Sequence, residues 1–167
     1  IPLMLFISRF PLTTYRRHAN LLLIGSGLFQ LLVFTPLGAE SGGNRNWVNI
    51  GFTTAQPSEF IKLAVAIWLG VYLPAIIQRN GPSNWRVLMP ILPLFGLMAL
   101  VLFGGDMGTA IIIFLVILGA LFFSGVTARV IAIPILVGLF GALLLAITSP
   151  NRMARIMSFL DANCIDY

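Results

Sequence analysis

The chain is poor in charge and in cysteine, and each shortage excludes a class of protein. Only 9% of its 167 residues are charged, whereas a soluble domain carries about 25%. The single cysteine, Cys164, excludes an internal disulfide and a cysteine-rich metal cluster. It either stays unpaired or pairs with a cysteine beyond Tyr167. No Ser-His-Asp set, phosphate-cradling glycine loop or zinc-ligand spacing occurs, and the one histidine, His18, fits a solvated basic cluster better than a catalytic role.

Hydrophobic residues are abundant instead. They make up 59% of the chain, and the mean hydropathy is +1.00, which is typical of a polytopic membrane protein. The net charge of +5 would suggest a nucleic-acid partner for a soluble chain. Because the arginines lie between apolar runs, we favour the membrane explanation and expect no nucleic-acid partner.

The apolar runs predict an all-α fold, a bundle of transmembrane helices in a single membrane domain. Each complete run is close to the roughly 20 residues that cross a bilayer as a helix. One partial run covers residues 1–8, and five complete runs cover 20–37, 57–78, 87–103, 107–125 and 128–148. The chain starts inside an apolar run and ends in a polar tail, so we expect it to be a fragment of a longer protein.

Basic residues alternate between the loops. The first, third and fifth loops hold Arg9, Arg16, Arg17, Arg79, Arg86 and Arg129, while the second holds only Arg45 and the fourth none. The excess of arginine on cytoplasmic loops predicts that the first, third and fifth loops face the cytoplasm. Loops 38–56 and 104–106 and the tail 149–167 are then expected on the outer face.

The stretch QPSEFIK places an acid and a base at the start of an apolar helix. Pro57 suits the first position of that helix. Glu59 and Lys62 are three residues apart, which puts them on one face and lets them neutralise each other. An ion pair that fixes helix packing and a polar cavity wall for an anionic or sugar-bearing ligand are both compatible with this spacing.

Asp106 precedes another apolar helix, and its simplest role is an N-cap that accepts hydrogen bonds from the first amides. Asp106 and Glu59 are also expected on the same side of the membrane. Two carboxylates near a lysine would suit a divalent cation or a proton transfer.

The second loop contains the sequence NRNWVNIG. Arg45 supplies a cation suited to phosphate, and Trp47 supplies an aromatic face suited to a sugar. A simple interfacial anchor is the alternative for Trp47, since tryptophans gather at membrane surfaces.

Three motifs, NRNWVNIG, QPSEFIKLA and GDMGTA, occur in this order, each at the expected outer end of a span. Together they resemble the SEDS family of bacterial cell-wall polymerases, which includes FtsW, RodA and SpoVE. The resemblance covers nearly the whole chain and corresponds to less than half of a ten-helix family member. The tail RMARIMSFLDANC resembles the division-associated FtsW branch more than the RodA branch.

The resemblance implies a set of residues at an outward-facing substrate cavity. The candidates that would line it are Arg45, Trp47, Gln56, Ser58, Glu59, Lys62, Asp106 and Thr109, with Pro57 and Gly108 in structural roles. Two positions depart from the family pattern: Gly105 replaces the usual proline before the aspartate, and Arg45 is not adjacent to Trp47. The family's catalytic aspartate is expected beyond Tyr167, so neither Asp161 nor Asp166 is assigned, and the fragment alone is expected to be inactive.

The implied activity is that of a peptidoglycan glycosyltransferase that polymerises lipid II in the bacterial inner membrane. The implied partners are a class B penicillin-binding protein and other division proteins, and no metal site or certain cofactor is implied. A flippase for lipid-linked precursors is the main alternative, although broken helices in inverted repeats are not evident. A non-catalytic membrane scaffold is the third.

Overall fold

The computed structural model describes residues 11–41, 44–49, 51 and 53–148. The chain divides after Thr127 into two compact units. The first contains α2 (Leu12–Leu31), the 3-10 turn η1 (Leu32–Phe34), β1 (Gly38–Ser41), β2 (Asn44–Asn49), β3 (Thr54–Ala55), α3 (Pro57–Asn80), the 3-10 turns η2 (Trp85–Val87) and η3 (Met89–Ile91), α4 (Leu92–Phe103) and α5 (Met107–Phe123). The second contains α6 (Ala128–Thr148). The partial helix predicted at 1–8 and the tail 149–167 lie outside the described residues.

Helix α2 starts earlier than its apolar run. It begins at Leu12 rather than at residue 20, directly after Pro11, whose backbone is extended (φ −67°, ψ 148°). The hydropathy pattern located the part of the helix that suits lipid, whereas helical hydrogen bonding continues through the basic residues that precede it. The helical segment then ends at Phe34 through η1, just before Thr35 and Pro36, because a residue before proline avoids helical geometry.

Helix α3 has clear start and stop signals. Pro57 occupies its first turn, where a missing amide hydrogen costs little. Gly81 ends it with φ 79°, a left-handed value that glycine adopts without strain, and the Gly81 amide donates to the Ile77 carbonyl at 2.8 Å. The helix has 24 residues and is therefore about 36 Å long.

The loop between α2 and α3 contains a small sheet that hydropathy did not predict. Strands β1, β2 and β3 are antiparallel in that order. Val48 is 2% exposed, and the Asn49 amide donates to the Leu37 carbonyl at 3.0 Å. Such pairing satisfies backbone groups beside an apolar bundle. The predicted helical fold is confirmed, and these strands are an addition to it.

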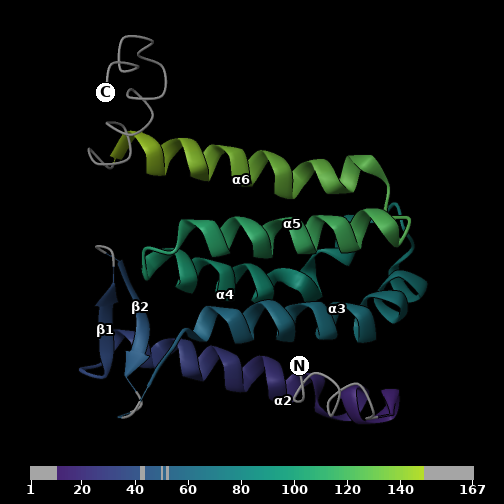
Figure 1. Ribbon diagram of the computed structural model, residues 1–167. Helices are drawn as coiled ribbons and strands as arrows, with labels where there is room; N and C mark the ends of the chain where they lie inside the picture. The colour runs from purple at the N-terminus through teal and green to yellow at the C-terminus, as the bar shows by residue number, and fades with distance from the viewer. Residues whose placement is uncertain (1–10, 42–43, 50, 52, 149–167) are drawn as a thin grey trace, which may run out of the picture. The chain divides into compact units, whose positions relative to one another are not determined.

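Within the first unit, α2 packs on α3, α3 on α5 and α4 on α5. Figure 1 shows these helices side by side, with the sheet at the end where α2 stops and α3 starts. The core side of α3 carries fully buried aliphatic residues, namely Ile61, Val65, Leu69 and Leu73. Gly27 lets α2 approach α4 closely, since a Cβ there would lie 2.8 Å from Leu97 Cδ2.

Three helical segments among the described residues are long and apolar enough to cross a membrane: Thr13–Phe34, Pro57–Asn80 and Trp85–Phe103. Two further apolar helices, Met107–Phe123 and Ala128–Gly141, are shorter. Large hydrophobic side chains remain exposed along these helices, for example Leu63 at 66% and Leu92 at 67%. Such exposure is unfavourable in water and favourable in lipid.

Candidate functional site at the sheet end of the helices

Asp106 lies in the turn between α4 and α5 and caps α5. Its Oδ1 accepts a hydrogen bond from the Thr109 amide at 3.0 Å, which confirms the predicted N-cap. The preceding residue, Gly105, has φ 85°. Proline is restricted to φ near −65°, so the turn here uses a geometry that the family's usual proline could not adopt.

The second carboxylate oxygen of Asp106 connects α5 to the start of α3. Its Oδ2 accepts hydrogen bonds from Gln56 Nε2 at 2.7 Å and from Ser58 Oγ at 3.1 Å. Ser58 is 1% exposed and Thr109 is 6% exposed, so water competes little for these groups. We call Gln56, Ser58, Asp106 and Thr109 the Asp106 cluster.

The hydrogen bonds of the cluster favour the ionised form of Asp106. Partial burial raises the pKa of this carboxyl, but donation from Thr109, Gln56 and Ser58 outweighs the burial. The net result is a pKa below the ordinary value for aspartate. Asp106 is therefore a carboxylate at neutral pH.

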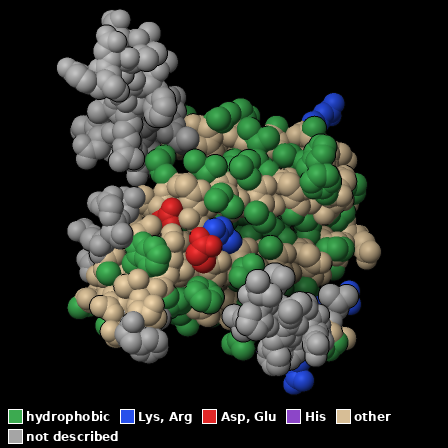
Figure 2. Space-filling model, in the orientation of Figure 1, with side chains coloured by type: hydrophobic (Ala, Val, Ile, Leu, Met, Phe, Trp, Pro, Cys, Tyr) green, Lys and Arg blue, Asp and Glu red, His purple; other side chains and the backbone are tan. Residues whose placement is uncertain are grey.

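Glu59 and Lys62 form the ion pair that their spacing predicts. Lys62 Nζ lies 2.7 Å from Glu59 Oε1, and their side chains are 23% and 56% exposed, respectively. Figure 2 shows acidic and basic side chains in contact on a surface that is otherwise largely hydrophobic and uncharged. Glu59 directly follows Ser58 of the Asp106 cluster, and Lys62 lies about one turn of α3 beyond Ser58. Phe60, between them, packs edge-to-face on Phe29 of α2 with the ring centroids 5.5 Å apart.

The NRNWVN motif forms β2, which lies at the same end of the helices as the Asp106 cluster. The backbone of Val48 pairs with Ala55, the residue before Gln56, and Trp47 pairs with Ala39. Trp47 is half-buried. Arg45 lies in β2 opposite Glu40, and its side chain lies outside the described part of the structure.

The two residues predicted to be structural differ in their surroundings. Pro57 is buried at the first turn of α3, while Gly108 is exposed and a Cβ there would lie 4.0 Å from Asp106 Oδ1. Within the described residues, no group of three or more His, Cys, Asp or Glu side chains could hold a metal ion. Asp161 and Asp166 lie outside the described residues.

All four members of the Asp106 cluster and the cap on α5 were predicted from the sequence, but the hydrogen bonds from Gln56 and Ser58 to Asp106 were not. Gln30, a polar residue of α2 that is 1% exposed, was also not predicted. The Oε1 of Gln30 has no hydrogen-bond partner in the described part of the chain. A glutamine inside an apolar run is the signal that could have drawn attention to it.

These features define a polytopic helical membrane protein with a polar cluster at one end of its helices. The family model of the FtsW/RodA/SpoVE cell cycle proteins matches residues 1–164. The chain belongs to this family.

Relatives and solved structures agree with that assignment. The probable peptidoglycan glycosyltransferase FtsW of Hydrogenovibrio crunogenus is 33% identical over 156 residues, which cover 93% of this chain and 40% of that protein. A chain from a peptidoglycan synthase complex is 27% identical with a TM-score of 0.67, covering 94% of this chain and 46% of that one. A point variant of the rod shape-determining protein RodA of Thermus thermophilus is 26% identical with a TM-score of 0.62, covering 84% and 45%. The chain thus spans less than half the length of these proteins.

Proposed function

We propose that the whole protein is a peptidoglycan glycosyltransferase that polymerises lipid II during cell division. The observation that carries the proposal is the Asp106 cluster, in which Asp106 joins the QPSE motif to the GDMGT motif through Gln56 and Ser58. These two motifs are far apart in sequence and meet at the end of the helices where the sheet lies. The FtsW relative carries the name of the same activity.

The charges at this end suit the proposed substrate. Lipid II has a lipid tail, an anionic pyrophosphate and sugars. Lys62 is paired with Glu59 and stays partly exposed, which supports a contact between its ammonium group and a phosphate oxygen. Arg45 would add a second cation, and the half-buried Trp47 would offer a face to a sugar.

Asp106 acts in this proposal as a positioning residue. Its carboxylate already accepts three hydrogen bonds from protein groups, and its pKa is lowered. A general acid or base works best with a pKa near the operating pH, which Asp106 does not have. Its role is to hold the start of α3 against α5 and so to place Glu59 and Lys62.

In the transfer step, a sugar hydroxyl of one disaccharide attacks the anomeric carbon of another. A glycosidic bond forms, the bond to undecaprenyl pyrophosphate breaks, and the hydroxyl proton passes to a base. Following the resemblance, we assign that base to an aspartate beyond Tyr167.

We also propose that the protein lies in the bacterial inner membrane, with loops 38–56 and 104–106 and the tail 149–167 on the outer face. The alternation of arginines between loops supports this orientation. A class B penicillin-binding protein is the proposed partner, supported by the likeness to a chain of a peptidoglycan synthase complex. The FtsW relatives favour a role in division alongside other division proteins.

The test combines the purified whole protein with its penicillin-binding partner and lipid II, and follows glycan chains by gel electrophoresis. We expect chains from the unaltered protein and from a control variant at the other end of the helices, Arg16→Gln. Absence of chains together with movement of lipid II across liposome membranes would support a flippase instead. Absence of both activities would support a scaffold.

A further inference from the structure

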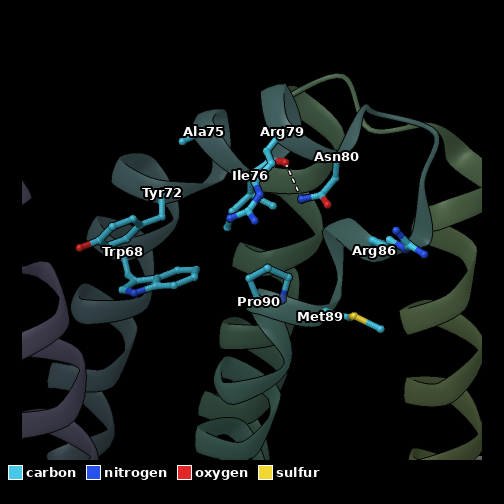
Figure 3. Close-up of a pocket in the computed structure, with 9 residues that line it drawn as sticks. All are labelled: Trp68, Tyr72, Ala75, Ile76, Arg79, Asn80, Arg86, Met89 and Pro90. Carbon is cyan, nitrogen blue, oxygen red and sulfur yellow. Dashed lines mark hydrogen bonds between the residues drawn. The ribbon is translucent and has the colours of Figure 1, made fainter.

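A hollow of about 450 Å³ lies at the opposite end of α3 from the Asp106 cluster. We call it the arginine groove. Figure 3 shows Trp68 and Tyr72 of α3 on one side, Arg86 and Met89 on the other, and Pro90 between them. Nothing in the proposed polymerase function uses this groove.

The groove is about as deep as one leaflet of a bilayer. Its α3 wall follows one face of the helix from Trp68 through Tyr72 and Ile76 to Arg79. Eleven residues separate Trp68 from Arg79, which corresponds to roughly 16 Å along the helix. The hydrocarbon core of a bilayer is about 30 Å thick.

The inner end of the groove is closed. One and two turns further along the same face of α3, Ala64 is 3% exposed and Ile61 is fully buried. Trp68 itself is fixed, because its Nε1 donates to Asn20 Oδ1 of α2 at 2.9 Å and its ring lies 5.1 Å from that of Tyr72. A partner's transmembrane helix would need an exposed face along the whole of α3, and the burial of this face beyond Trp68 therefore argues against such a partner.

The open end of the groove, at the end of α3 farthest from the Asp106 cluster, is cationic. Arg79 and Arg86 are exposed, and neither forms a salt bridge with a carboxylate among the described residues. In Figure 3, Arg79 reaches from the end of α3 over the hollow. Guanidinium groups bind phosphate oxygens through paired hydrogen bonds, and basic pockets between membrane helices bind anionic headgroups.

We propose that the arginine groove binds one anionic phospholipid. The headgroup phosphate binds Arg79 over the hollow, Arg86 adds a second positive charge at the same end of the groove, and an acyl chain runs along Ala75, Ile76 and Tyr72 toward Trp68. The combination of a cationic open end, an apolar wall and a depth of one leaflet favours a phospholipid over a soluble acidic segment, which would not need the apolar wall.

Native mass spectrometry of the purified whole protein tests this proposal, with phosphatidylglycerol or phosphatidylcholine of identical acyl chains added after removal of bound lipid. We expect preferential retention of phosphatidylglycerol. The pair Arg79→Gln and Arg86→Gln should lower that retention by roughly fivefold for each arginine removed. Ala75→Trp, which fills the groove and leaves both arginines in place, should lower retention of both lipids.

The matched control is the pair Arg16→Gln and Arg17→Gln, which removes the same charge from exposed positions on α2 and should leave retention unchanged. Equal retention of the two lipids by the unaltered protein, or an equal loss in the control pair, would overturn the proposal. If the Arg79 and Arg86 variant fails to fold, Ala75→Trp carries the test, and unchanged retention there overturns it. A photocrosslinker at Met89 should capture phospholipid in cell membranes; capture of a protein instead would also overturn it.

Discussion

Asp106 Oδ2 accepts a hydrogen bond from Gln56 Nε2 at 2.7 Å, between residues that are 50 positions apart. This contact joins the residue that caps α5 to the residue that precedes α3. It therefore sets how the two helices meet at the proposed substrate end. Four predictions test this end of the protein.

Replacing Asp106 with alanine should destabilise the protein more than replacing it with asparagine. Asp106→Ala removes the cap and leaves the buried Ser58 hydroxyl without its acceptor, a loss of about 2–4 kcal/mol. In Asp106→Asn, the side-chain oxygen still accepts from the Thr109 amide. The new NH2 group can donate to Ser58 Oγ and, once the Gln56 amide has turned, to Gln56 Oε1. The loss of stability in Asp106→Asn should therefore be about 1 kcal/mol. Unfolding in detergent measures both. Equal losses would contradict this prediction, because Asp106→Asn keeps the cap that Asp106→Ala removes.

The Asp106 cluster should make stability depend on acid pH. The pKa of Asp106 is lowered in the folded protein, so its contribution is complete above the unfolded pKa of about 4. The contribution is then lost as pH falls through the lower folded value. The unaltered protein should therefore melt at a higher temperature than Asp106→Asn near neutral pH, and this difference in melting temperature should narrow below about pH 4. A difference in melting temperature that stays constant into strong acid would contradict the assignment of Asp106 as a carboxylate.

Gly105 should not tolerate the proline that is usual in the family. The backbone of Gly105 has φ 85°. Gly105→Ala should therefore lower the free energy of unfolding by about 1–2 kcal/mol. Gly105→Pro should lower it further, because the proline ring cannot adopt this angle. The control is Gly70→Ala within α3, where a Cβ meets nothing within 4 Å and helix propensity should improve by about 0.8–1 kcal/mol. The melting temperature distinguishes them. A higher melting temperature for Gly105→Pro would contradict the turn described here.

Lys62 should matter more for lipid II than Glu59 does. If the Lys62 ammonium meets the pyrophosphate, Lys62→Met should raise KM by roughly tenfold or more, the scale of a lost hydrogen bond to a charged group. Glu59→Gln keeps a partner for Lys62 and should have a smaller effect. Steady-state polymerisation with varied lipid II measures this difference. Unchanged kinetics in both variants, with normal folding, would assign the ion pair to helix packing alone.

Local features of the site could be predicted because neighbouring residues decide them. The proline at the start of α3, the cap at Asp106 and the three-residue spacing of Glu59 and Lys62 all follow from the geometry of a single helix. The strands between α2 and α3 escaped prediction because hydropathy locates apolar segments and carries no information on which backbone amides will pair. The early start of α2 at Leu12 escaped for a related reason, since a helix can extend beyond its lipid-facing part.

Composition and the lengths of the apolar runs were sufficient to predict a helical membrane protein, because transfer into lipid requires long apolar segments whose backbone hydrogen bonds are satisfied internally. The three motifs were sufficient to suggest the family. The convergence of Gln56 and Ser58 on Asp106 required the packed helices, because hydrogen bonds between distant segments depend on how α3 meets α5. The same holds for the arginine groove, whose walls come from α3 and from the turns before α4.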